Sequence, residues 1–84
     1  MKLITIRNSE MYSLENVKSV IISEISSSKH TTYGTPYYLY SGYIAIQYFG
    51  NTITNIDLKD YENESCLKRD LQIVFDKIHE ILSQ

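Results

Sequence analysis

Residues 43–58 read YIAIQYFGNTITNIDL and consist of two strand-like runs with a short turn between them. Both runs, residues 43–49 and 52–58, are rich in β-branched and aromatic side chains, which favour half-buried pleated backbone. The Gly50-Asn51 pair between them suits a two-residue hairpin loop, because both residues tolerate a positive φ. The segment therefore predicts an antiparallel hairpin. The residues expected on its core face are Ile44, Ile46, Tyr48, Ile56 and Leu58.

The C-terminal residues show the periodicity of an amphipathic helix. Their apolar positions recur at intervals of three and four, at Leu67, Leu71, Val74, Phe75, Ile78, Ile81 and Leu82. Asp60, Asn63 and Ser65 are each possible N-caps, and Glu64 precedes Lys68 by four residues, which is the favourable order for an ion pair. We therefore predict a helix over residues 62–82 with one apolar face.

The N-terminal third is less uniform. The first residues predict a strand with Ile4 and Ile6 inward and Thr5 and Arg7 outward, followed by a turn over residues 8–10. Residues 13–27 have two interpretations. Val17, Val20, Ile21 and Ile25 have helical spacing after a possible Ser13 cap, whereas the β-branched content favours short strands with a turn at Asn16. We favour strands, and the helical alternative stays open.

Length and composition limit the fold class. Eighty-four residues correspond to one small domain over residues 1–84, and a chain with 43% hydrophobic and 21% charged residues has the composition of a globular protein. The expected fold is α+β: a small antiparallel sheet of four or five strands with the C-terminal helix packed on one face. If residues 13–27 were helical, the order would be β-α-β-β-α. The expected core residues are Ile4, Ile6, Ile44, Ile46, Leu71, Phe75 and Ile78.

Charge and hydropathy exclude several classes of protein. A net charge of −2 opposes a dedicated nucleic-acid binder, and one cysteine excludes a disulfide framework. The chain has no signal-peptide core and no run near the ~18 apolar residues of a membrane span. The expected compartment is the cytoplasm, where Cys66 stays reduced.

Three segments carry a resemblance to other proteins. LITIRN at residues 3–8, YSLENV at residues 12–17 and a closing IHEIL at residues 78–82 occur in that order, with a hairpin before the final helix. In this the chain resembles short uncharacterised proteins of Gram-positive bacteria, their phages and mobile elements. The resemblance implies a binder or inhibitor, as in anti-defence proteins such as anti-CRISPRs, and it transfers no functional residues.

The pattern of reactive side chains predicts neither catalysis nor a cofactor. The candidate metal ligands His30, Cys66 and His79 are far apart in sequence, and the Asp76–His79 pair is expected near the solvent-facing edge of the helix. No nucleophile elbow and no glycine-rich phosphate loop is present. Cys66 lies near the start of the helix, but the acidic residues before it oppose thiolate formation. We therefore predict a non-enzyme without a metal or a cofactor.

Tyrosines concentrate in the middle of the chain. Residues 30–56 contain no Asp, Glu, Lys or Arg, and five of the eight tyrosines fall between positions 33 and 43: Tyr33, Tyr37, Tyr38, Tyr40 and Tyr43. One helix covers only one face of a small sheet, so part of this aromatic set is expected to be exposed. Aromatic enrichment with charge depletion is typical of interface centres, although tyrosine also simply favours strands. Both interpretations stay open.

Two further groups are candidates for contact with a partner. Asp57, Asp60, Glu62 and Glu64 form either a solvated turn or an acidic surface for a basic partner. Ile73, off the apolar stripe, and Cys66, one heptad away, mark a possible homodimer contact.

The expected function is a non-enzymatic protein-interaction module that binds a host protein or a copy of itself. It would use the tyrosine-rich strand and the acidic turn, and neither nucleic acid nor a membrane is an expected partner. The alternatives are a protein that sequesters a small ligand or nucleotide between tyrosines, and a structural homo-oligomer.

Overall fold

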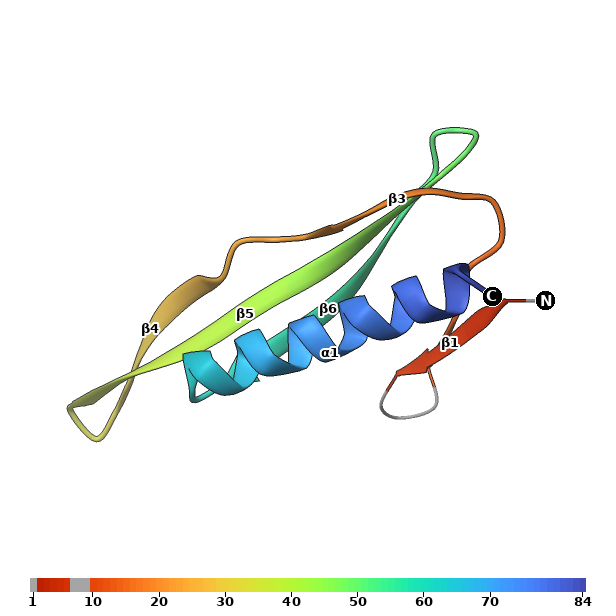
Figure 1. The fold of residues 1–84 in the computed structure, drawn as a ribbon. Coiled ribbons are helices and arrows are strands. Elements are labelled where there is room, and N and C mark those ends of the chain that lie inside the picture. Colours follow the sequence, from red (N-terminus) through yellow and green to blue (C-terminus); the bar gives the residue numbers. More distant parts are fainter. Residues whose placement is uncertain (1, 7–9) are drawn as a thin grey trace.

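The structure, a computed structural model that describes residues 2–6 and 10–84, contains one helix packed over antiparallel strands (Figure 1). The elements in chain order are β1 (Leu3–Ile6), β2 (Glu10–Ser13), β3 (Val17–Ile22), β4 (Ser26–Thr32), β5 (Thr35–Tyr48), β6 (Ile53–Tyr61) and α1 (Glu64–Leu82). The predicted α+β class is confirmed. Residues 13–27 form strands around a turn at Asn16, where φ is 58°, so the helical alternative is wrong.

Strand β5 is the centre of the larger sheet and pairs with three antiparallel neighbours. Along one edge, β3 pairs with the C-terminal half of β5 and β4 pairs with its N-terminal half. Strand β6 occupies the opposite edge, because it pairs with the same residues 44–47 as β3 and shares Tyr40 with β4. Strands β3 and β4 thus follow one another along one side of β5, interrupted at residues 23–25.

Strands β1 and β2 form a separate two-stranded sheet, whereas the N-terminal strand was expected in the main sheet. Ile4 and Ile6 point inward as predicted, and β1 packs against α1. The Lys2 ammonium donates to the carbonyl oxygens of Leu82 at 3.4 Å and Gln84 at 3.0 Å, which ties this sheet to the end of the helix. The predicted positions of Arg7 and of most of the turn at residues 8–10 lie outside the described residues.

The core lies between α1 and the sheets. Its buried side chains are Ile4, Ile6, Leu14, Ile44, Ile46, Ile56, Leu58, Leu67, Leu71 and Ile78. The prediction of Phe75 as a core residue is wrong: it is half-buried at the margin, and its ring lies 4.4 Å from that of His79. At Gly42 of β5 an added Cβ would lie 2.8 Å from a methyl of Leu71, so glycine permits the close approach of helix and strand.

Two boundaries differ from the sequence predictions. The β5–β6 loop spans residues 49–52 rather than the two residues Gly50-Asn51, and the Tyr48 N–H donates to the Thr52 carbonyl at 2.8 Å. The helix begins at Glu64 rather than residue 62, because the Asn63 side chain caps it by accepting from the N–H groups of Ser65 at 2.8 Å and Cys66 at 3.2 Å.

Candidate functional site

A two-stranded ribbon, residues 26–38, projects past the first turn of α1 at one end of the molecule (Figure 1). We call it the arm. Strand β4 and the start of β5 pair in register up to Thr32 opposite Thr35, so the turn consists of Tyr33 and Gly34 alone. Their φ values are 51° and 78°, as a type I′ hairpin turn requires. The arm gives the molecule its length of 50 Å against 22 and 20 Å in the other directions.

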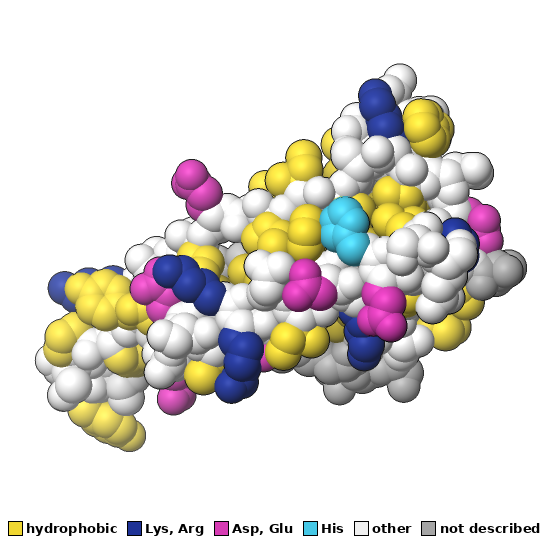
Figure 2. Space-filling model, in the orientation of Figure 1, with side chains coloured by type: hydrophobic (Ala, Val, Ile, Leu, Met, Phe, Trp, Pro, Cys, Tyr) yellow, Lys and Arg dark blue, Asp and Glu magenta, His cyan; other side chains and the backbone are white. Residues whose placement is uncertain are grey.

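The arm is exposed because its neighbours end before it does. Strand β6 ends at Tyr61, opposite Tyr40, and α1 begins three residues later. All thirteen residues from 26 to 38 are exposed, and residues 29–32 pair with residues 35–38 beyond the end of β6. Figure 2 shows hydrophobic side chains gathered at this end of the molecule. The arm has one charged residue, Lys29. An exposed surface with hydrophobic side chains and so little charge is unusual in a protein that has no partner.

Three of the five predicted tyrosines lie on the arm. Tyr33 is at the tip and is fully exposed, with a relative accessibility of 102%. Tyr38 is half-exposed. It lies two residues from Tyr40 in β5, and because side chains alternate along a strand, both are on the helix side of the ribbon. Tyr37 is on the opposite face, where its ring stacks on His30 at 5.4 Å between centroids. The arm thus presents aromatic rings at its tip and on both faces.

The other two predicted tyrosines lie at the base of the arm. Tyr40 is half-buried and packs against the core, so it supports the fold as well as adjoining the arm. Tyr43 is exposed on the sheet face away from the helix, opposite Asp57 of β6.

The four predicted acidic residues do not form one surface. Asp57 is paired with Tyr43 in register, and Asp60 occupies a bulge of β6 at a φ of 62°. Glu64 lies 3.7 Å from Lys68 and lines a hollow on the β3 side of the helix with Glu24. Only Glu62 adjoins the arm tyrosines. It lines an open hollow of about 430 Å³ together with Tyr37, Tyr38 and Tyr40.

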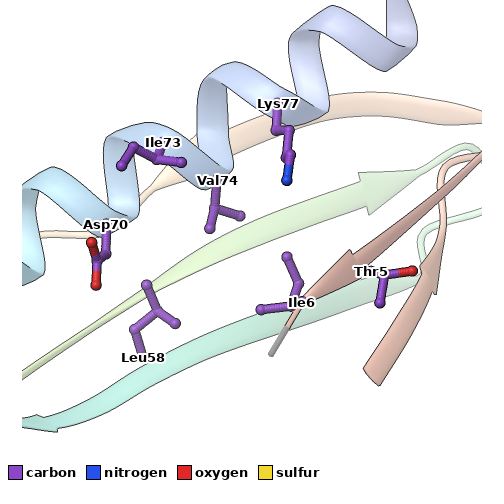
Figure 3. A pocket seen from close by; sticks show the side chains of 7 residues that line it. All are labelled: Thr5, Ile6, Leu58, Asp70, Ile73, Val74 and Lys77. Carbon is purple, nitrogen blue, oxygen red and sulfur yellow. The ribbon is translucent and has the colours of Figure 1, made fainter. Parts of the chain in front are cut away.

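The proposed dimer residues Cys66 and Ile73 lie on one flank of the helix. Ile73 is 53% exposed and borders a groove of about 200 Å³ between α1, β1 and β6 (Figure 3). The groove is lined by Thr5, Ile6, Leu58, Asp70, Ile73, Val74 and Lys77. Cys66 is half-buried and borders an adjoining hollow that shares Asp70. A homodimer through this flank stays a prediction.

The reactive side chains singled out in the sequence are engaged in other contacts. Asp76 accepts a hydrogen bond from Gln72 at 2.8 Å, His79 packs on Phe75, and His30 bonds to Ser28 at 2.9 Å while stacking on Tyr37. Among residues 2–6 and 10–84, no group of three or more His, Cys, Asp or Glu side chains is placed to hold a metal ion. No helix in the described part of the chain is long and apolar enough to cross a membrane.

Sequence reasoning missed the arm. The hairpin signal of residues 43–58 drew attention to β5 and β6, whereas residues 26–32, SSSKHTT, lack the apolar alternation of a strand. The available signal was the Tyr33-Gly34 pair between Ser/Thr-rich and Tyr-rich runs, which is weaker than Asn-Gly because tyrosine disfavours a positive φ.

No protein-family model, curated protein or solved structure matches this chain. Its function must therefore be inferred from the residues of its own surface.

Proposed function

We propose that this chain is a non-enzymatic interaction module that binds a protein partner through the arm. The observation that supports the proposal is the exposure of every residue from 26 to 38, in a ribbon that extends past the helix and carries three tyrosines. A structural role alone does not require a strand to continue beyond the sheet that it stabilises. Exposed aromatic side chains in a ribbon with a single charge fit the centre of a protein interface.

Energetics support the same proposal. A two-stranded ribbon without a third strand or a covering helix is only marginally stable in water. A partner that packs on the arm would stabilise it and would cover its tyrosines, each of which can bury roughly 150–250 Å² at low cost in rotamer entropy. Tyr33, Tyr37 and Tyr38 together would supply a large part of the ~800 Å² per partner that a standard interface buries.

The partner that we propose is a cytoplasmic protein of the host. The resemblance of the three sequence segments implies that binding would inhibit this protein. A ribbon with an aromatic tip fits a recess on a partner better than a flat surface does. The arm would enter such a recess with Tyr33 first.

The test is affinity capture from host lysate with three versions of the tagged chain. The arm variant carries Tyr33→Asn, Tyr37→Thr and Tyr38→Thr, because Asn tolerates the positive φ at position 33 and Thr retains strand propensity. The matched control carries Met11→Thr, Phe49→Thr and Ile53→Thr, which replace three exposed apolar side chains away from the arm.

We expect one stoichiometric protein to be retained by the unmodified chain and by the control, and lost by the arm variant. Thermal denaturation of all three versions checks that each is folded. Retention of the partner by the arm variant, or equal loss from both variants, would contradict the proposal.

A further inference from the structure

Beyond the end of strand β6, an open hollow lies beside β5. The last pair of these strands is Tyr40 with Tyr61. From there β5 continues into the arm, where β4 on its other edge is its only partner within residues 2–6 and 10–84. The hollow at this position is lined by Tyr37, Tyr38, Tyr40 and Glu62. Three tyrosines, with Tyr37 on the opposite face of the ribbon from the other two, and one carboxylate thus border an edge of β5 that pairs with no other strand among the described residues.

No ion pair between described residues neutralises the carboxylate of this hollow. Glu62 is exposed, and it takes part in neither of the ion pairs Glu64–Lys68 and Arg69–Asp70. Lys59 lines the adjoining hollow, which Glu62 shares, but no ion pair holds Glu62 within residues 2–6 and 10–84. Lys29 is opposite Tyr38 in register, yet it belongs to β4, on the far edge of β5 from the hollow.

We infer that this hollow binds an arginine side chain of the protein partner. The inference rests on the proposed function and specifies the chemistry of the partner. A guanidinium group stacks on tyrosine faces and donates two parallel hydrogen bonds to a carboxylate. Arginine suits the hollow better than lysine, because its planar group is more weakly hydrated and loses less on leaving water.

The free edge of β5 defines the backbone of the occupant. An extended segment of the partner can continue the line of β6 by adding to this edge as a strand, as peptides do in β-augmentation. Pro36 has no N–H to donate, so the added strand is short and ends near it. Because side chains alternate along a strand, such a segment directs every second residue to the face of the ribbon that Glu62 adjoins.

The test uses two synthetic peptides and the ¹⁵N-labelled full chain. One peptide is acetyl-Thr-Val-Arg-Val-Thr-amide, and the other has Gln in place of Arg. We expect the arginine peptide to shift the amide resonances of Tyr37, Tyr38, Tyr40 and Glu62, and the glutamine peptide to bind about tenfold more weakly.

The decisive variant is Glu62→Gln, which retains the shape of the side chain and removes its charge. It should weaken the arginine peptide about tenfold and leave the glutamine peptide unchanged. The matched control is Glu24→Gln in the hollow on the β3 side of the helix, which should change neither affinity. Absence of shifts at the hollow, equal binding of the two peptides, or unchanged arginine binding in Glu62→Gln would overturn the inference.

The capture experiment separates this inference from the proposed function. If the arm variant loses the partner while Glu62→Gln retains it at full strength, the arm is the interface and the arginine site is wrong. If the arm variant retains the partner, the proposed function itself fails, and the peptide titration then reports on the hollow alone.

Discussion

The two halves of strand β5 lie in different environments although they belong to one strand. Residues 44–47 lie between β3 and β6 and beneath α1, and Ile44 and Ile46 are fully buried. Residues 35–38 pair with β4 alone in the described part of the chain, and all of them are exposed. Both halves alternate their side chains between the two faces. The difference shows that burial along β5 depends on how far its neighbours extend, since the strand itself continues past them.

The tyrosines of β5 follow the same division. Tyr48 is half-buried, and its hydroxyl donates to the Ser13 carbonyl at 2.5 Å, while Tyr40 packs against the core. Tyr37 and Tyr38 lie beyond the end of β6, where they are exposed. The same residue type therefore stabilises the fold in one half and is available to a partner in the other.

The largest expected effect is a difference in stability between the two halves. Ile44→Ala should lower the free energy of unfolding by about 2–5 kcal/mol, because it leaves a cavity in a fully packed site. Tyr38→Thr on the arm should change it by no more than about 0.5 kcal/mol. Urea denaturation of both variants measures the difference, and similar losses would show that the arm is part of the core.

A smaller loss of stability is expected at the N-terminus of α1, the helix that covers the buried half of β5. Asn63→Ala removes the acceptor for the N–H groups of Ser65 and Cys66 and should cost about 1 kcal/mol of stability. The neighbouring Glu62→Ala serves as control, since Glu62 is exposed and the N-cap of the helix is Asn63. Equal denaturation midpoints for the two variants would show that the cap contributes nothing.

The next expected effect is a loss of local stability that is confined to the arm. Gly34 has a φ of 78° with open space around it, so Gly34→Ala meets no clash and costs about 1 kcal/mol of backbone strain. Amide hydrogen exchange within residues 26–38 should accelerate about fivefold, while the urea midpoint of the whole chain stays unchanged. A shifted midpoint would mean that the arm and the core unfold together.

The smallest expected effect concerns the β1–β2 sheet, which pairs with no strand of the larger sheet in the described part of the chain. The hydrogen bond from Tyr12 to Glu10 raises the pKa of the Tyr12 phenol, and burial and the negative charges of Glu10 and Asp57 add to the rise. The folded state therefore holds this proton more tightly than the unfolded state does. The resulting stabilisation is complete below pH 10 and is lost as the pH rises through the folded pKa.

Denaturation midpoints of the unmodified chain and of Tyr12→Phe, measured from pH 8 upward, test whether stability falls with rising pH as predicted. The variant should lose less stability at alkaline pH than the unmodified chain. A parallel decline of the two would contradict the assignment.

Local patterns predicted the elements that have strong periodicity. The apolar spacing from Leu67 to Leu82 placed the helix to within two residues of its observed start, and the alternation of Ile44 and Ile46 placed the core face of β5. Predictions were weakest where the pattern is polar or mixed, as in the SSSKHTT segment of β4 and the margin of the helix at Phe75. Of the candidate site, the tyrosines and Glu62 were both predicted as candidates for partner contact, whereas the hollow that Glu62 lines with Tyr37, Tyr38 and Tyr40 was not predicted.

The sequence by itself determined the helix with its apolar stripe and the alternation of side chains along β5, because both follow from backbone periodicity within one segment. Only the tertiary structure decided which of those side chains are covered. Whether a side chain of β5 is covered depends on where β6 ends, at Tyr61, and on where the helix begins, after Asn63. Both positions matter relative to β5, which lies earlier in the chain. The exposed arm and its hollow exist because β5 extends beyond both, and that relation between distant segments is set by packing rather than by local pattern.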